Sequence, residues 1–153
     1  MARGVADREK AAVLPSAAAG VLTLEAKERR VRLSWAAGSD PRERWVEPGT
    51  WTVRDTWTLR AREGVEWALS CSGAPEGPFE AKAGETAPVA LEEVVRFSGR
   101  ARREGKGLAL EFSLKGDRGR GVSVWKAWKR VPVRWRVLGK DGKEIAAGTM
   151  NYG

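Results

Sequence analysis

The sequence contains no histidine, and this absence restricts the chemistry open to the chain. Without an imidazole, Ser-His-Asp and Cys-His catalysis, histidine ligation of haem and most zinc sites are excluded. The 20 Asp and Glu residues follow no ordered catalytic motif either. We therefore expect a protein that is not an enzyme, with no cofactor and no bound metal.

Cysteine is nearly absent as well, since Cys71 is the single one. One cysteine excludes an intrachain disulfide, and because it is Cys71, no lipoprotein-type attachment of lipid to a cysteine near the N-terminus is expected. Its position on the apolar parity of a predicted strand favours a small buried side chain over a reactive thiol.

Long hydrophobic runs are also missing. No apolar stretch approaches the roughly 18 residues expected of a membrane-spanning helix. The first dozen residues include Asp7, Glu9 and Lys10 and no continuous apolar segment, so no signal peptide is predicted. For a chain that is the complete gene product, this predicts the cytoplasm.

The charge that is present is strongly biased. The net charge is +8, but residues 96–140 hold 14 basic and 3 acidic side chains, a net of +11 that leaves −3 for the rest. Such a separation bears on partners rather than on fold. It predicts a basic surface that suits an acidic protein surface or a polyanion.

Alternation of apolar and polar residues dominates residues 51–71. One parity of the first run is mainly apolar, and the other carries threonine and arginine; the apolar parity is Trp51, Val53, Trp57, Leu59 and Ala61. After Glu63-Gly64 the alternation restarts with Val65, Trp67, Leu69 and Cys71. A period of two with this composition predicts two half-buried strands joined as a hairpin. Asp55 interrupts the inward parity, which indicates either a bulge that turns it to solvent or a buried carboxylate paired with an arginine.

Shorter alternating runs extend through the rest of the chain, at 21–24, 31–35, 79–82, 88–91, 95–102, 108–114, 131–137 and 145–150. Turn signals separate them, and no helix is expected after residue 20. The pattern predicts an all-β fold, an antiparallel two-sheet sandwich of immunoglobulin-like or transthyretin-like type, with a small closed barrel as the alternative. Residues 1–20 are expected to form an N-terminal arm, helical or disordered, and residues 21–153 a single domain.

One segment resembles a known family. Pro48-Gly49-Thr50-Trp51-Thr52-Val53 is similar to the PGTYTV-type turn and strand of transthyretin-like, carboxypeptidase-regulatory-like domains, with tryptophan where that family usually has tyrosine. The resemblance covers six residues and does not extend to that family's opening strands. It implies a non-enzymatic accessory sandwich, of a kind often appended to larger surface or envelope proteins.

Tryptophans and cations alternate between Gly119 and Trp135, in the segment GRGVSVWKAWKRVPVRW. Trp125 and Trp128 are three residues apart, so a straight strand cannot turn both inward. Either at least one is exposed, or the segment bends. An exposed tryptophan beside lysine suggests a binding surface. The alternative is that Trp128 closes the end of the core and the lysines are ordinary solvated charges.

Two further features complete the candidate site. Trp45 lies outside any alternating run and is either a lid over one end of the sandwich or a ligand platform. The GDRGRG segment at 116–121 lacks the order of a phosphate-binding loop and is expected to be a hairpin loop that could contact a polyanion. The candidate binding residues are Trp45, Arg118, Arg120, Trp125, Lys126, Trp128, Lys129, Arg130 and Arg134.

These features predict a non-enzymatic binding or structural module, part of a larger assembly, with a basic tryptophan-bearing surface for an acidic protein or polyanion. A carbohydrate-binding module would instead use Trp45, Trp125 and Trp128 as stacking platforms. A nucleic-acid-binding protein would add Arg100, Arg102 and Arg103 to the candidate residues.

Overall fold

The structure is a computed structural model that describes residues 10–39, 43–72 and 77–150. These residues form strands and no helix, so none of them belongs to a helix able to cross a membrane. The strands are β1 (Ala11–Pro15), β2 (Gly20–Ala26), β3 (Arg29–Trp35), β4 (Arg44–Val46), β5 (Gly49–Arg62), β6 (Val65–Ser72), β7 (Phe79–Ala81), β8 (Thr86–Val89), β9 (Val95–Glu104), β10 (Gly107–Gly116), β11 (Ser123–Lys126), β12 (Lys129–Arg130), β13 (Val133–Leu138) and β14 (Glu144–Met150).

The largest sheet has the order β12-β11-β6-β5-β2-β3, and β7 pairs with the first part of β5. The predicted hairpin of residues 51–71 lies at its centre as β5 and β6. Glu63 and Gly64 form the turn between them with φ angles of 53° and 74°, as a tight two-residue hairpin turn requires. The sheets stay open and do not close into a barrel, so the sandwich is the correct alternative.

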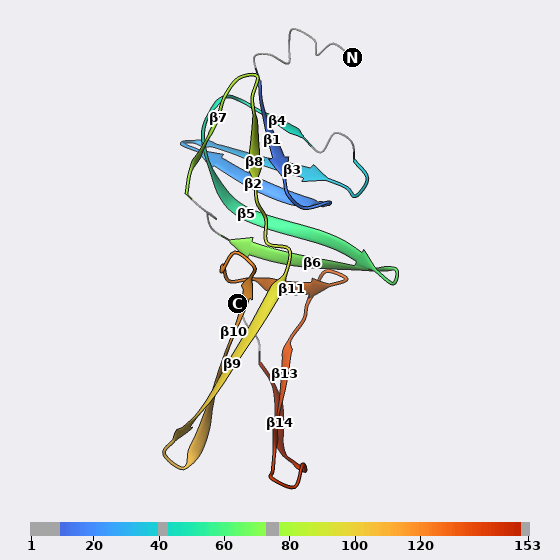
Figure 1. The fold of residues 1–153 in the computed structure, drawn as a ribbon, viewed down its shortest axis with the longest axis vertical. Coiled ribbons are helices and arrows are strands. Elements are labelled where there is room, and N and C mark those ends of the chain that lie inside the picture. The colour runs from blue at the N-terminus through green and yellow to red at the C-terminus, as the bar shows by residue number, and fades with distance from the viewer. Residues whose placement is uncertain (1–9, 40–42, 73–76, 151–153) are drawn as a thin grey trace.

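A smaller sheet, β4-β1-β8, covers one face of the large sheet and completes the sandwich (Figure 1). Its β1 and β8 run parallel, which departs from the antiparallel expectation. The core lies between these layers and contains Ala11, Val13, Ala17, Leu22, Leu24, Leu33, Trp35, Val46, Trp51, Val53, Ala81, Val89 and Leu91. We call this covered face of the large sheet the inner face, and the opposite one the outer face.

The predicted N-terminal arm differs from the structure over its second half. Residues 1–9 lie outside the described residues, but Ala11–Pro15 form β1 and are neither helical nor loose. Ala11, Ala12 and Val13 are almost fully buried. A short apolar run carries no periodicity signal of its own, so its strand conformation depends on β4 and β8, which flank it.

A bulge in β5 reverses the predicted inward and outward faces of the second half of that strand. Thr23 of β2 pairs with Asp55, whereas the next residue, Leu24, pairs with Val53, so Arg54 is the extra residue. Before the bulge Trp51 and Val53 point inward, and after it Thr56 and Thr58 are the buried residues. The prediction that Trp57 and Leu59 point into the core is therefore wrong, because one extra residue exchanges the two faces.

Two β-ribbons project from the same end of the sandwich (Figure 1). One is the β9–β10 hairpin and the other the β13–β14 hairpin, and each is a two-stranded sheet of its own. We call β1 to β8 with β11 and β12 the body. Residues 90–94, the crossing linker, connect β8 of the body to β9 across the inner face, where Thr58 Oγ1 donates a hydrogen bond to the Glu92 carbonyl at 2.7 Å.

Candidate functional site

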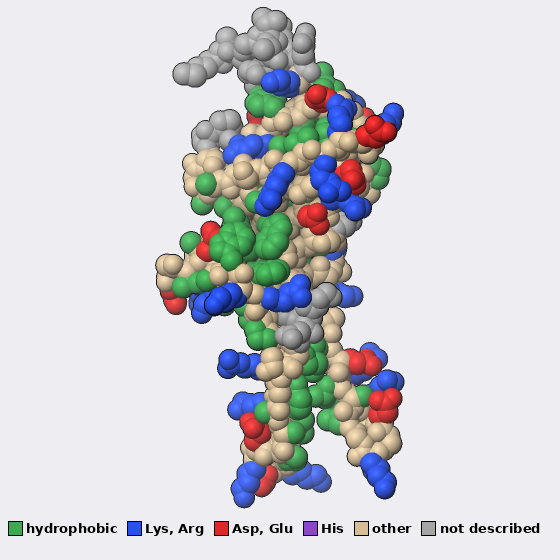
Figure 2. Space-filling model, turned by 180° about the vertical axis from the view of Figure 1, so that it is seen from behind, with side chains coloured by type: hydrophobic (Ala, Val, Ile, Leu, Met, Phe, Trp, Pro, Cys, Tyr) green, Lys and Arg blue, Asp and Glu red, His purple; other side chains and the backbone are tan. Residues whose placement is uncertain are grey.

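Three tryptophans form a cluster on the outer face. The ring centroids of Trp57 and Trp125 are 5.3 Å apart, and those of Trp57 and Trp128 are 6.0 Å apart. Both pairs are tilted, a favourable geometry for aromatic rings. Figure 2 looks onto this side of the molecule and shows hydrophobic side chains gathered at the level of the large sheet, with Lys and Arg around them.

Small residues of β6 make room for the rings. Ser70 pairs with Trp57 on one side and Ser123 on the other, and Ala68 pairs with Leu59 and Trp125. Trp57 and Trp125 are thus diagonal neighbours across a strand that carries only short side chains at these positions. Trp125 Nε1 also donates a hydrogen bond to Ser70 Oγ at 2.8 Å, which fixes the orientation of its indole ring.

Trp128 is the accessible member of the cluster, with 61% of its surface exposed. It lies in the two-residue turn between β11 and β12, where Ala127 and Trp128 have φ angles of 47° and 62°. A turn of this kind normally selects glycine or asparagine, and a bulky residue there costs about 1–2 kcal/mol. In this strained turn the ring of Trp128 lies against the ring of Trp57.

Cations border the cluster unevenly. The Arg130 guanidinium lies 5.3 Å from the centroid of the Trp125 ring, and Arg130 pairs with Trp125 on the outer face. Lys126 instead lies 5.2 Å from the ring of Trp67, on the opposite face of the sheet because neighbouring residues of β11 alternate. Lys129 pairs with Lys126 and therefore lies on that opposite face as well. The tryptophan–cation surface on the outer face consists of Trp57, Trp125, Trp128 and Arg130.

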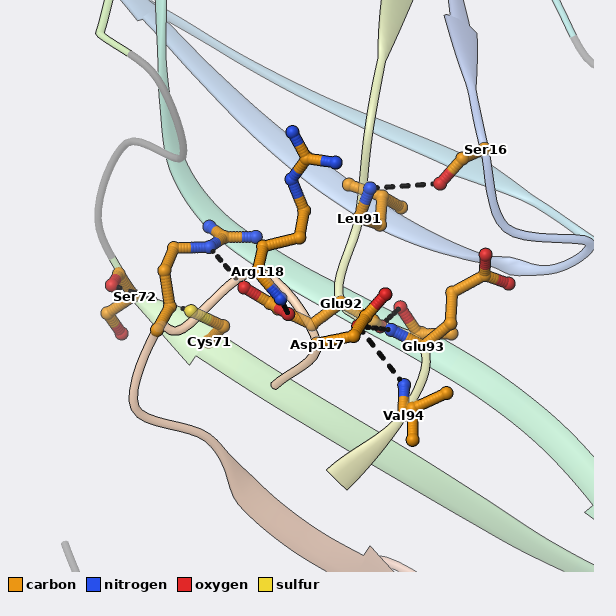
Figure 3. A network of polar contacts seen from close by, with 11 residues as sticks. Ser16, Cys71, Ser72, Leu91, Glu92, Glu93, Val94, Asp117 and Arg118 are labelled. Atoms are coloured by element: carbon orange, nitrogen blue, oxygen red, sulfur yellow. Dashed lines mark hydrogen bonds and ion pairs between the residues drawn. The ribbon is translucent and has the colours of Figure 1, made fainter. Parts of the chain in front are cut away.

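Arg118 and Arg120 have a different place from the one expected. The Glu92 side chain, 1% exposed, accepts hydrogen bonds from Arg120 Nε at 2.9 Å and from the Arg118 backbone N–H at 2.8 Å. Arg120 itself is only 11% exposed, so it is part of a buried ion pair rather than of a basic surface. Figure 3 shows the Glu92 side chain of the crossing linker next to Arg118 of the 117–120 loop.

Two more features stabilise the junction, the name we give to the packing of the 117–120 loop on the crossing linker. Gly116 leaves space for the Glu92 carboxylate, which a Cβ atom at that position would overlap. Asp117 Oδ1 accepts hydrogen bonds from the backbone N–H groups of Glu93, at 3.0 Å, and Val94 (Figure 3). The hydrogen bond from Glu93 in particular holds the pKa of the Asp117 carboxyl below its ordinary value.

Cys71 lies beside this junction and is buried, as its position in the sequence predicts. Burial raises the pKa of the Cys71 thiol, and the positive charge of Arg120 partly offsets that effect. A raised pKa disfavours the thiolate at neutral pH. The thiol therefore has the character of a small apolar side chain.

The remaining predicted residues are not part of the tryptophan–cation surface. Trp45 is in β4 of the smaller sheet, 37% exposed, and Figure 1 shows β4 at the far end of the body from β11. Arg134 lies on β13 and is exposed along a ribbon. The nine candidates are thus divided among five places, and only Trp125, Trp128 and Arg130 come together.

Trp57 is the member of this surface that the sequence interpretation assigned to the core. The signal that could have placed it correctly is Asp55, which breaks the apolar parity one residue after the bulge. When a bulge reverses the faces of a strand, residues on the formerly inward parity point to solvent and those on the other parity become buried. A carboxylate on the inward parity, followed by two threonines on the other parity, fits such a reversal.

Among the described residues, no three His, Cys, Asp or Glu side chains are grouped so as to hold a metal ion. No family model, no curated protein and no solved structure matches this chain.

Proposed function

We propose that this chain is a non-enzymatic binding module of a larger assembly, and that the tryptophan–cation surface binds an anionic macromolecule. The observation that carries the proposal is the exposed ring of Trp128, held in a strained turn beside Trp57 and on the same face as Arg130. Strain of this kind persists where the surrounding structure enforces it and is concentrated at functional sites. An aromatic face with adjacent cations suits a ligand that offers both a flat or apolar group and a negative charge.

The uneven charge supports an anionic partner. Residues 96–140 carry a net charge of +11, and most of their cations lie on β11–β12 and along both ribbons. Such a field attracts a polyanion or an acidic protein surface and accelerates encounter with it. Binding should therefore weaken steeply as salt is added.

The test is a titration of the purified chain with heparin and with single-stranded DNA, across a range of salt. We expect Trp128→Gly to reduce affinity by about 5- to 150-fold, the effect of losing one stacking contact of about 1–3 kcal/mol. Arg130→Ala should weaken binding and lower the slope of log affinity against log salt by about 1.

Trp128→Gly separates binding from folding. Glycine relieves the positive φ of the turn, while the contact with Trp57 is lost, and these two effects on stability are similar in size and opposite in sign. The matched control is Trp45→Ala, which removes an exposed tryptophan from the other sheet. Equal loss of affinity in both variants, or no binding by the wild type, would contradict the proposal.

A carbohydrate ligand is the second candidate, favoured by the open face of Trp128, since sugar rings stack on such faces. This candidate predicts affinity that survives high salt, and it predicts that Arg130→Ala has little effect. Titration with soluble oligosaccharides at low and high salt distinguishes the two candidates.

A further inference from the structure

The β9–β10 ribbon has one apolar and one charged face. Its register places five residue pairs on one face: Val95/Gly116, Phe97/Leu114, Gly99/Phe112, Ala101/Leu110 and Arg103/Leu108. Phe97 and Phe112 stack there with centroids 6.2 Å apart, and Arg103 is the single charged residue of the ten. The opposite face carries charged residues such as Arg96, Lys115 and Arg100.

The β13–β14 ribbon repeats this arrangement. One face presents Val133/Met150, Trp135/Gly148 and Val137/Ala146, with the Trp135 ring lying so close over Gly148 that a Cβ atom there would collide with it. The other face carries Arg134 and Arg136. Figure 2 shows hydrophobic side chains along one side of each projecting ribbon and charged side chains along the other.

The described part of the chain leaves these apolar faces incompletely covered. Phe97 is 60% exposed and Leu108 is 52% exposed, although both lie on the apolar face. An isolated two-stranded ribbon is at best marginally stable in water. A continuous apolar face that is exposed along a whole ribbon marks an interaction site. Something must cover these faces for both ribbons to persist.

We propose that the apolar faces of both ribbons pack against those of a second copy of this chain, forming a two-fold symmetric dimer. An apolar face with no charge except at its tip is complementary to itself, as an isologous interface requires. The cations lie on the opposite faces of the ribbons, so packing apolar face to apolar face leaves them in water rather than in the interface.

The area is sufficient only when both ribbons take part. At about 3.3 Å per residue and about 10 Å for two strands, the ten-residue ribbon offers roughly 330 Å² and the shorter one roughly 220 Å². Two copies would bury about 1,100 Å² in total, at the lower limit for a specific interface. The dimer is therefore weak, with a dissociation constant in the micromolar range or above.

The salt dependence of dimer formation distinguishes this interface from the tryptophan–cation surface. Two copies that each carry a net charge of +8 repel one another, and salt screens that repulsion. Dimer formation therefore strengthens with salt, whereas binding of an anionic ligand to the tryptophan–cation surface weakens with it. The opposite signs separate a failure of this inference from a failure of the proposed function.

The experiment is analytical ultracentrifugation of the full chain from micromolar to millimolar concentration, at about 0.1 M and about 1 M salt. We expect the mass to rise from one chain toward two, at lower protein concentration in the higher salt. A mass that stays at one chain at every concentration, or a dimer that salt weakens, would overturn the proposal.

Adjacent residues on opposite faces provide matched variants. Phe97→Lys places a charge on the apolar face of the ribbon and should weaken dimerisation at least about tenfold. Ser98→Lys adds the same charge to the opposite, charged face of the ribbon and should change dimerisation little. Val137→Lys and Leu138→Lys form the corresponding pair on the second ribbon. Equal effects within each pair would also overturn the proposal, because net charge alone would then explain the result.

Discussion

The body and the ribbons are built from the same alternating sequence pattern but differ in burial. In the body, Leu22, Leu24 and Trp51 are almost completely enclosed between two sheets. In β9, nine of the ten residues are exposed, although they alternate as regularly. The difference shows that alternation specifies a strand with two unlike faces, whereas burial depends on a second layer being present.

The junction between the two regions is where this difference is maintained. Glu92, Arg120 and Asp117 fix the crossing linker and the loop that follows β10, so β9 begins and β10 ends at an anchored point. We infer that the body supplies most of the stability, while the ribbons supply surface. Three comparisons of variants test this division, beginning with the junction itself.

Breaking the junction should have the largest effect. Glu92→Ala removes the carboxylate that faces the buried Arg120 guanidinium, and the expected loss of unfolding free energy is about 3–5 kcal/mol, measured by urea denaturation. The neighbouring variant Glu93→Ala removes a partly exposed ion pair with Arg60 and should cost less than about 1 kcal/mol. Similar losses in the two variants would mean that the junction contributes no special stability.

The same substitution in the body and in a ribbon compares the regions directly. Leu24→Ala leaves a cavity in the core and should cost about 2–5 kcal/mol. Leu108→Ala should cost less than about 1 kcal/mol at protein concentrations where the chain is monomeric, because its side chain is already half exposed. Equal losses in denaturant unfolding would show that the ribbons are packed as tightly as the body.

The smallest expected effect is a change in the stability of the fold at low pH. Because the folded-state pKa of Asp117 is lowered, its contribution to stability is complete above the ordinary value of 3.8 and is lost as the pH falls through the lowered pKa. Asp117→Asn should therefore reduce stability slightly at neutral pH and flatten the loss of stability in acid. Denaturation midpoints measured at neutral pH and below pH 3.8, with Glu63→Gln at an exposed turn as the charge-matched control, check this. A steeper loss for Asp117→Asn than for the wild type would contradict the prediction.

The sequence by itself determined most of the strands. Period-two patterns and turn residues placed β2, β3, β5 to β10, β13 and β14, and the burial of Cys71, because these features depend on local backbone geometry. The same local reasoning indicated that Trp125 and Trp128 could not both face inward, which is consistent with the exposure of Trp128.

Only the tertiary structure decided which face of each strand is covered. The bulge at Arg54 moved Trp57 from the core to the outer face, and the junction took Arg120 out of the basic surface and into an ion pair with Glu92. Both outcomes depend on contacts between residues far apart in the chain: the pairing of β2 with β5, and the packing of the crossing linker on the 117–120 loop. A pattern read along one strand contains no information about a partner strand's register, so it could not fix either.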